Sequence, residues 1–546
     1  MTANMLASAT LVDEWIRCGV RHAVIAPGSR STPLAVALAN RDELQIHVVH
    51  DERVAAFMAL GIGLGGVPAV LLCTSGTAAV NFHPAVVEAG LSEVPMIVCT
   101  ADRPPELRGV GAPQTIDQIE LYGRSARWFT DAPVPDRDQP DQRGLWRPLA
   151  QRAFVSATAG PVHVNLPFRE PLLDASGSFE LPGVIGPPVR IPPSTLPGGW
   201  GTSGPLDVEF DRQRGVIIAG GRSGAAPTEV VALAERLGWP ILADPCSGVR
   251  EHAVTAFDSL LRHAEFAHAH APEIVVRVGR PPASKTLSQW VIASGAPVLQ
   301  VGGPGVVNPD GNVTKFCSLA DLATLNGAPG TPWLARWRHA NERAEAVFDQ
   351  LSADEQLTEP AIARLVAPAA RRIGSLVVSS SMPVRDVEWF GGRSANAHAN
   401  RGANGIDGVM STAVGTALET GSTVTVLIGD IAFLHDSNAL VGLTSRGVDL
   451  RIVVVDNGGG GIFSFLPQSA ALSRDRFEQL FGTPHGSDIC ALAAAHGLRS
   501  GTVATASSLA AALSEPGPSL IRVATDREAN VAEHQRWHAA VAAALG

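Results

Sequence analysis

The chain has 546 residues, which predicts about three domains at roughly 100–200 residues per domain. Its 42 Lys+Arg and 52 Asp+Glu give a formal net charge of −10, which argues against a protein that binds nucleic acid through bulk charge. Hydrophobic residues make up 45% and charged residues 17% of the chain, a balance that excludes a disordered protein.

The sequence shows no paired cysteines, no export signal and no membrane-spanning segment. The six cysteines are far apart and form no CxxC pair, so we expect neither a disulfide framework nor a zinc site. The first residues show no basic segment followed by an apolar core, and we therefore expect a cytoplasmic protein. Val54 to Cys73 carries no charge, but its glycines and Pro68 indicate a helix, a turn and a strand rather than a membrane span.

Four apolar strands are predicted in the first segment, separated by helical stretches. They are 20–26, 45–49, 69–73 and 95–100. This alternation predicts βαβ units and a parallel sheet. Polar or glycine-rich residues follow all four strands, at the carboxyl edge where such sheets bind ligands. We therefore expect this edge to be functional.

The rest of the chain repeats the same alternation. A first domain at 1–180 is followed by a proline- and glycine-rich linker at 181–212, a central domain at 213–330 and a last domain at 331–546. Predicted strands of the central domain are 215–219, 273–278 and 297–301. The predicted fold class is therefore α/β, with three doubly wound parallel-sheet domains.

The first and last domains share a faint internal repeat. At an offset of 354 residues, Gly61, Leu64, Val70 and Leu72 coincide with Gly415, Leu418, Val424 and Val426. Both stretches contain a helix with glycine, a short turn and an apolar strand. We interpret them as two related α/β domains on either side of the central one.

Two strands of the last domain end in residues suited to a metal and a phosphate. The strand at 423–428 ends in Gly429-Asp430, and the strand at 450–455 ends in Asp456-Asn457 and four glycines. A right-handed helical crossover through Ala439, Leu440 and Leu443 would place both ends at one sheet edge. Carboxylate, amide and carbonyl oxygens suit Mg²⁺, and a glycine run lets backbone N–H groups approach a phosphate. Each half alone is also typical of an ordinary turn.

The two halves together resemble the magnesium–diphosphate signature of thiamine diphosphate-dependent enzymes. The resemblance implies thiamine diphosphate and Mg²⁺ as cofactors, with Mn²⁺ as an alternative ion. It implies Asp430, Asn457 and the carbonyl of Gly459 as metal ligands. It also implies that Glu52 hydrogen-bonds the aminopyrimidine of the cofactor and that Ile406 is the apolar wedge that bends it. Asp456 occupies a position that does not ligate in this family.

Four further stretches are similar to the family of 2-succinyl-5-enolpyruvyl-6-hydroxy-3-cyclohexene-1-carboxylate (SEPHCHC) synthases of menaquinone biosynthesis. They are 26–34 (APGSRSTPL), 100–107 (TADRPPEL), 400–403 (NRGA) and 462–467 (IFSFLP). The resemblance implies a transferase that decarboxylates 2-oxoglutarate and adds the succinyl-semialdehyde unit to isochorismate. It also implies a dimer or tetramer with active sites at the subunit interface.

The resemblance further implies a cationic substrate site, since the two substrates together carry four carboxylates and arginine binds a carboxylate bidentately. The implied substrate residues are Ser29, Arg30, Arg103, Gln114, Lys285, Arg385 and Arg401, with Ile462, Phe463 and Leu466 as an apolar wall. Ser29, Arg30 and Gln114 are implied in catalysis together with Glu52, and Gln114 is the expected proton-handling side chain. Ser380 stands where this family commonly has an asparagine.

Two alternatives remain open from the sequence. Another 2-oxo-acid decarboxylase or carboligase, such as acetolactate synthase, would share the cofactor signature and usually bind FAD in the central domain. A nicotinamide- or flavin-binding protein without thiamine chemistry would rest on the glycine-rich loop at 220–224, which follows a predicted strand. A bound flavin, visible in the absorbance spectrum, would favour either alternative.

Overall fold

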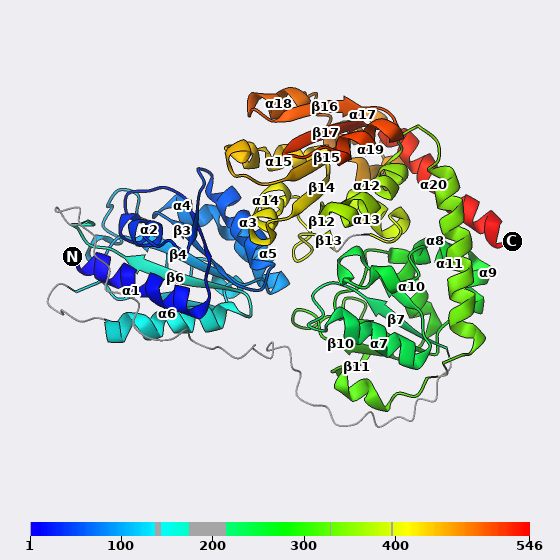
Figure 1. The fold of residues 1–546 in the computed structure, drawn as a ribbon, viewed down its shortest axis with the longest axis horizontal. Helices are drawn as coiled ribbons and strands as arrows, with labels where there is room; N and C mark the ends of the chain where they lie inside the picture. The colour runs from blue at the N-terminus through cyan, green and yellow to red at the C-terminus, as the bar shows by residue number, and fades with distance from the viewer. Residues whose placement is uncertain (1, 137–142, 174–213, 328, 395–396) are drawn as a thin grey trace. The chain divides into compact units, whose positions relative to one another are not determined.

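The computed structural model describes residues 2–136, 143–173, 214–327, 329–394 and 397–546. These residues form two compact units, which are described separately (Figure 1). The first unit comprises Met1–Leu196 and Asn400–Gly421, and the second comprises Pro197–Ala399 and Ser422–Gly546. The predicted linker at 181–212 lies outside the described residues.

The first unit contains a six-stranded parallel sheet in the order β2-β1-β3-β4-β6-β5. Its strands are β1 (His22–Ile25), β2 (Gln45–Val48), β3 (Ala69–Cys73), β4 (Met96–Asp102), β5 (Trp128–Asp131) and β6 (Pro161–Pro167). The four interior strands β1, β3, β4 and β6 are buried along their whole length, as expected for a sheet covered on both faces.

Helices cover both faces of this first sheet. They are α1 (Ala3–Cys18), α2 (Thr32–Ala39), α3 (Glu52–Gly63), α4 (Thr77–Asn81), α5 (His83–Ser92), α6 (Arg143–Ala157) and α14 (Val409–Thr420). The helices α1, α2 and α6 enclose one core with the sheet, whereas α3 and α5 pack on the opposite face (Figure 1). Helix α14 comes from far along the chain and crosses α3.

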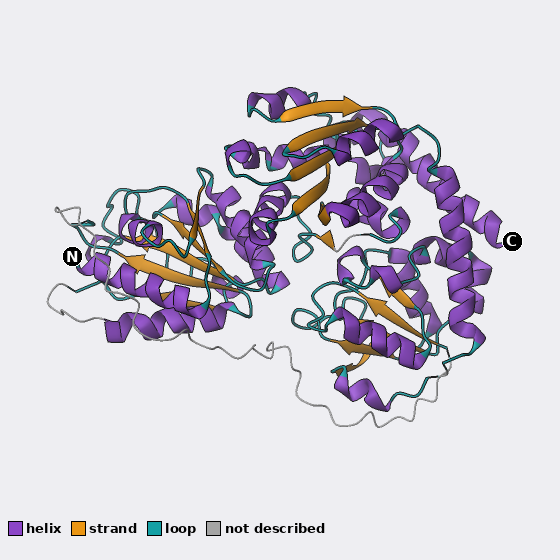
Figure 2. Cartoon of the chain, viewed as in Figure 1, coloured by secondary structure: helices purple, strands orange, loops and turns teal. Residues whose placement is uncertain are grey.

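The second unit contains two further parallel sheets among its described residues (Figure 2). One has the order β11-β10-β9-β7-β8, with strands β7 (Gly215–Ala219), β8 (Ile241–Ala243), β9 (Ile274–Val278), β10 (Val298–Val301) and β11 (Val313–Cys317). Its helices are α7 (Pro227–Leu237), α8 (Phe257–Arg262), α9 (Ala264–Ala269), α10 (Lys285–Ser294) and α11 (Pro332–Leu351). The long helix α11 also packs along the C-terminal helix α20 (Arg527–Leu545).

The other sheet has the order β13-β12-β14-β15-β17-β16. Its strands are β12 (Gly374–Val378), β13 (Ala397–His398), β14 (Thr423–Gly429), β15 (Leu450–Asp456), β16 (Arg499–Val503) and β17 (Ser519–Ala524). The associated helices are α12 (Glu359–Ile373), α13 (Met382–Phe390), α15 (Asp430–His435), α16 (Gln468–Ala471), α17 (Arg474–Phe477), α18 (Ile489–Ala495) and α19 (Ala506–Ser514). The three parallel sheets confirm the predicted α/β class.

The predicted strands agree with the observed ones to within a few residues, but the crossover between β14 and β15 differs from the prediction. Instead of one helix through Ala439 and Leu443, the chain forms the short helix α15 and two 3₁₀ turns. The connection remains a parallel crossover, because β14 and β15 are adjacent and pair Gly429 with Val455.

The glycine-rich loop at 220–224 packs tightly against its own domain. A Cβ on Gly220 would lie 1.6 Å from the carbonyl oxygen of Arg280, and one on Gly221 would lie 3.2 Å from Cβ of Cys246. Backbone packing therefore accounts for glycine at these two positions.

The helices in the described part of the chain differ from membrane-spanning segments. None of its helices is both long and apolar enough to cross a bilayer. The uncharged stretch from Val54 to Cys73 forms most of α3, a turn and β3, as the sequence predicts.

Candidate active site

The predicted metal ligands of the second unit lie together at the carboxyl edge of its sheet. Asp430 begins α15 directly after β14, and only 2% of its surface is exposed. Its Oδ1 accepts a hydrogen bond from the Ile431 N–H at 2.7 Å, and its Oδ2 accepts one from the Gly459 N–H at 2.9 Å. The hydrogen bond to Gly459 joins the two halves of the motif. Burial raises the pKa of Asp430, and the two backbone N–H groups oppose that rise.

Asn457 supplies an oxygen that no protein group satisfies. Its Nδ2 donates to Oε1 of Glu359 at 3.0 Å, which fixes the orientation of the side-chain amide. Its Oδ1 is buried and has no hydrogen-bond donor among the described residues. A buried acceptor left unsatisfied costs on the order of 1–3 kcal/mol, so a ligand at this oxygen is favoured. With Asp430 and the Gly459 carbonyl, it forms a set of hard oxygen donors that fits Mg²⁺.

The glycine run is required by the close approach of another loop. A Cβ on Gly459 would lie 1.9 Å from the carbonyl oxygen of Gly482. The same oxygen accepts a hydrogen bond from the Gly460 N–H at 2.8 Å. No larger residue fits at Gly459, and the loop is thereby held against residues 482–486.

Both carboxylate oxygens of Asp456 accept hydrogen bonds from other protein groups. Its Oδ2 accepts a hydrogen bond from Nε of Arg522 at 2.6 Å, and its Oδ1 accepts one from the Gly458 N–H at 3.2 Å. That Asp456 does not ligate stays a prediction, because its carboxylate also lies near Asp430 and His485.

His485 is a neighbour that the sequence reasoning missed. Its Nε2 lies 3.3 Å from Oδ2 of Asp430 and 3.7 Å from Oδ1 of Asp456. Ligand atoms of these three residues lie within 4.8 Å of one another. The loop that carries His485 does not follow a strand. A search for polar residues at strand ends therefore does not predict it. The sequence signal is the turn Thr483-Pro484-His485-Gly486.

Glu52 lies at the carboxyl edge of the first unit's sheet. The side chain of Asp51 caps α3 by accepting from the N–H groups of Arg53 and Val54, which places Glu52 in the first turn. Burial raises the pKa of the Cys73 thiol, and the charge of Glu52 adds to that rise. Because α3 begins after the carboxyl end of β2, Glu52 lies at the same edge of the sheet as the residues that follow β3.

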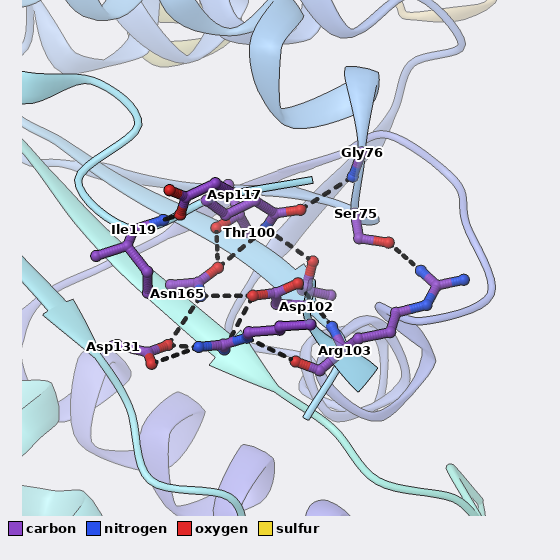
Figure 3. Close-up of polar contacts among 12 residues, drawn as sticks. Ser75, Gly76, Thr100, Asp102, Arg103, Asp117, Ile119, Asp131 and Asn165 are labelled. Carbon is purple, nitrogen blue, oxygen red and sulfur yellow. Dashed lines mark hydrogen bonds and ion pairs between the residues drawn. The ribbon is translucent and has the colours of Figure 1, made fainter. Parts of the chain in front are cut away.

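Two of the predicted substrate residues are joined through Ser75, at the end of β3. Arg103 donates from Nη1 to Oγ of Ser75 (Figure 3). Ser75 Oγ donates to the Gln114 carbonyl at 2.9 Å, and Gln114 Nε2 donates back to the Ser75 carbonyl at 3.1 Å. This connected set of three residues is called the Ser75 cluster below.

Arg30 brings a second cation to the same edge. It donates to the Phe168 carbonyl at 3.1 Å and to Oε1 of Glu170 at 3.3 Å. Burial lowers the pKa of Arg103, and the positive charge of Arg30 lowers it further. Ser29 precedes Arg30 in the same turn and is exposed. Two neighbouring guanidinium groups favour binding of an anion such as a carboxylate.

Arg401 and Ile406 lie on a loop that a buried carboxylate holds in place. Glu88 on α5 is 4% exposed and accepts from the N–H groups of Gly402 and Ala403, each at 2.7 Å. Both Arg401 and Ile406 are partly exposed. The loop belongs to the first unit, as do Glu52 and the Ser75 cluster.

The remaining predicted substrate residues lie in the second unit. Arg385 on α13 donates to the Ser381 carbonyl at 2.6 Å, and Lys285 is exposed at the start of α10. Ile462 and Phe463 are half-buried, and Leu466 lines a pocket. The structure thus groups the metal-ligand set in one unit and the Arg30–Arg103–Gln114 set in the other.

Sequence models of three thiamine pyrophosphate enzyme domains match the chain in order (thiamine pyrophosphate is thiamine diphosphate). They are the "Thiamine pyrophosphate enzyme, N-terminal TPP binding domain" at residues 5–121, the "Middle domain of thiamine pyrophosphate" at 206–378 and the "Thiamine pyrophosphate enzyme, C-terminal TPP binding domain" at 391–523. The matches cover most of all three parallel sheets.

The chain is also similar over its full length to curated proteins named 2-succinyl-5-enolpyruvyl-6-hydroxy-3-cyclohexene-1-carboxylate synthase. The protein of Myxococcus xanthus (strain DK1622) is 40% identical, over 100% of this chain and 98% of that protein. The protein of Thermobifida fusca (strain YX) is 42% identical over 100% of both chains, and that of Chloroflexus aurantiacus is 40% identical over 97% of both. The chain therefore belongs to the SEPHCHC synthase family of thiamine diphosphate-dependent enzymes.

Proposed function

We propose that this enzyme decarboxylates 2-oxoglutarate and adds the succinyl-semialdehyde unit to isochorismate, giving SEPHCHC and CO₂ in menaquinone biosynthesis. The observation that carries this proposal is the full-length identity of about 40% to relatives of that name. The enzyme is a transferase that uses thiamine diphosphate and Mg²⁺, with Mn²⁺ as an alternative ion. When bound, thiamine diphosphate supplies the electron sink that the decarboxylation requires.

In this proposal Asp430, Asn457 and the carbonyl of Gly459 hold the metal. The unsatisfied Asn457 Oδ1 supports this assignment, because the ion would replace a donor that the protein does not provide. The diphosphate would be held through this metal, because the N–H groups of Gly459 and Gly460 already donate to Asp430 and to the Gly482 carbonyl.

Glu52 and Ile406 orient the cofactor. Glu52 holds the aminopyrimidine through a carboxylate hydrogen bond, which is supported by its place in the first turn of α3. Ile406 supports the bend of the cofactor from the loop that Glu88 holds.

The cationic side chains bind the four carboxylates of the two substrates. Arg30 and Arg103 contribute two neighbouring guanidinium groups, and Arg385, Arg401 and Lys285 contribute the other cations. Gln114 would handle the proton by holding a water at its side-chain amide, because an amide does not itself ionise near neutral pH. Ser29 contributes a hydroxyl next to Arg30, and Ile462, Phe463 and Leu466 form the apolar wall beside the isochorismate ring.

We further propose a cytoplasmic dimer or tetramer with active sites at the subunit interface. Its domain boundaries are 1–180 for the pyrimidine-binding domain, 181–212 for the linker, 213–330 for the central domain and 331–546 for the diphosphate-binding domain. The similarity of the first and third matched domains to the N-terminal and C-terminal TPP binding domains supports this order.

Substrate choice separates this proposal from an acetolactate-type carboligase. The purified enzyme with thiamine diphosphate and Mg²⁺ is supplied with 2-oxoglutarate or with pyruvate, and CO₂ release is measured. We expect release from 2-oxoglutarate and an absorbance spectrum without a flavin band. Release from pyruvate alone, or a bound flavin, would support the carboligase alternative.

A further inference from the structure

A buried glutamine lies behind the Ser75 cluster. Gln118 is 1% exposed, and its side chain connects three separate segments of the first unit. Oε1 accepts a hydrogen bond from the Gly76 N–H at 2.9 Å. Nε2 donates to the Ala101 carbonyl at 3.2 Å and to Oδ1 of Asn165 at 2.9 Å. Gln118 thus ties the turn after β3 to strands β4 and β6.

Asn165 on β6 fixes the orientation of this connection. It is fully buried, and its Oδ1 accepts from Thr100 at 2.8 Å as well as from Gln118. Its Nδ2 donates to Asp102 at 2.9 Å and to Asp131 at 2.8 Å (Figure 3). A side-chain amide has two donor hydrogens and two acceptor sites, so all four are used here. A rotation of the Gln118 or Asn165 amide by 180° would therefore break hydrogen bonds.

The hydrogen bonds of Gln118 and Asn165 connect the backbone at Arg103 with the backbone at Gly76, beside Ser75. On one side, Oδ1 of Asp102 accepts from the Arg103 N–H at 2.7 Å. On the other side, Gln118 holds the N–H of Gly76, the residue next to Ser75. The side-chain amides of Gln118 and Asn165 therefore set the distance between the Arg103 backbone and the Ser75 hydroxyl. The Arg103 guanidinium donates its hydrogen bond to that hydroxyl.

Gln114 depends on the same support. Its φ of +55° lies in the left-handed region, which is unfavourable for a residue with a Cβ. Such a conformation persists only where surrounding contacts hold it. The two hydrogen bonds with Ser75 are those contacts. A Cβ on Gly76 would lie 3.1 Å from Cγ of Gln114, so the turn also contacts this side chain directly.

We propose that Gln118 is a positioning residue that sets the geometry of Arg103 and Gln114 for substrate binding by holding the Ser75–Gly76 turn. This inference rests on the proposed function, because that proposal assigns Arg103 and Gln114 to the substrate site. Gln118 is buried and acts on the substrate only through Ser75, Arg103 and Gln114.

The test replaces Gln118 in the full-length enzyme with thiamine diphosphate and Mg²⁺ bound. Gln118→Met keeps the length of the side chain and removes its amide. We expect the KM for one or both substrates, isochorismate and 2-oxoglutarate, to rise about tenfold, since small displacements of positioning groups have large kinetic effects. Tyr122→Phe is the matched control, because it removes one buried hydrogen bond, from the Tyr122 hydroxyl to the Ala79 carbonyl at 2.6 Å, outside the network. We expect it to leave both KM values within about twofold of wild type.

A double-mutant cycle separates positioning from a general structural effect. In an Arg103→Ala background, Gln118→Met should raise KM by a smaller factor than in the wild-type enzyme, because one of the two substrate residues through which it acts is gone. The proposal is overturned if neither KM changes more than in Tyr122→Phe, or if the effect of Gln118→Met is undiminished in the Arg103→Ala background. If Gln118→Met does not fold, Gln118→Ala, which leaves space for a water, is measured against the same two criteria. Absence of turnover in the wild-type enzyme would instead count against the proposed function.

Discussion

Asp430 receives two backbone hydrogen bonds while almost fully buried, and the cation-binding role proposed for it makes a direct prediction. Asp430→Ala should lower the Mg²⁺-dependent affinity for thiamine diphosphate by about 100-fold or more, since even outer partners of metal ligands are worth roughly 10–100-fold. Isothermal titration calorimetry with the cofactor, in the presence and absence of Mg²⁺, measures this affinity.

Asp456 provides the comparison for that measurement. Because it already pairs with Arg522 at 2.6 Å, Asp456→Asn should change the same affinity much less. Equal losses in the two variants would show that the metal assignment is wrong.

Asp430 and Asn457 could be predicted from the sequence for a physical reason. Both follow apolar strands joined by a crossover, and the carboxyl ends of adjacent parallel strands meet at one edge. The surroundings of these residues could not be predicted in the same way. Glu359, which orients Asn457, begins a helix far earlier in the chain, and His485 lies on a loop. Such contacts depend on packing between distant segments, which leaves no local pattern.

His163 on β6 makes stability depend on pH. It is fully buried, and its Nε2 lies 2.8 Å from Oγ1 of Thr100. Thr100 donates its own hydrogen to Asn165, so the imidazole must donate from Nε2, which leaves Nδ1 as an acceptor without a hydrogen-bond partner among the described residues. Burial lowers the pKa of His163 from 6.5 to about 3, and the nearby Asp131 opposes the shift.

A lowered histidine pKa means that the unfolded chain binds a proton more readily than the folded one. The contribution of His163 to the free energy of unfolding is therefore at its full value above pH 6.5. It is lost as the pH falls towards 3, by up to about 1.4 kcal/mol per pH unit. His163→Gln should flatten the fall of the melting temperature between about pH 6.5 and 4.5, and the exposed His339 provides the matched His339→Gln control. An equally steep fall in the His163→Gln variant would contradict this account.

At the scale of elements, the crossing of α3 and α14 depends on two glycines. A Cβ on Gly61 would lie 2.1 Å from the carbonyl oxygen of Thr412, and one on Gly415 would lie 2.1 Å from that of Met58. These are the same two glycines that coincide in the internal repeat. The structure gives that coincidence a physical reason, because each glycine lets the other helix approach.

Gly61→Ala should therefore destabilise the enzyme by about 1–3 kcal/mol, the usual cost of overpacking, although alanine is the better helix former. Gly144→Ala is the matched control, since Gly144 lies on α6 and a Cβ added there would have no neighbouring atom within 4 Å. Thermal unfolding should show a clear loss for the first variant and no loss for the second. Similar melting temperatures would mean that the helices separate at little cost.

The strands differ in how far the sequence predicts them. Central strands such as β3, β7 and β15 are largely apolar and buried along their length, because helices cover them on both faces, and their positions follow from the sequence. The edge strands β5, β11 and β16 alternate or mix polar and apolar residues, since they are only partly covered. Their pairing depends on the neighbouring strand, and they were not predicted. The interior strands β6, β12 and β17 were not predicted either, whereas the edge strand β2 was.

At the scale of the whole molecule, a site shared between subunits predicts that activity depends on association. We expect analytical ultracentrifugation to show a dimer or tetramer, and we expect dilution below its dissociation constant to abolish CO₂ release. A monomer with full activity at every concentration would contradict the proposed interface.

The net charge of −10 is a poor guide to the ligand, because it averages over the exterior. The proposed substrates are small anions, and the groups suited to them are a few arginines placed at strand ends and turns. Arg30 and Arg103 are near enough that the charge of one lowers the pKa of the other. The placement of these cations, rather than their number, carries the functional information.

The turnover of isochorismate together with 2-oxoglutarate, with and without thiamine diphosphate and Mg²⁺, tests the central claim most directly. CO₂ release and formation of SEPHCHC are followed by mass spectrometry of the same reaction. We predict that SEPHCHC forms only when both substrates and both cofactors are present, and that at least one CO₂ is released for each SEPHCHC formed. Formation of SEPHCHC without thiamine diphosphate, or its absence from the complete mixture, would contradict the account.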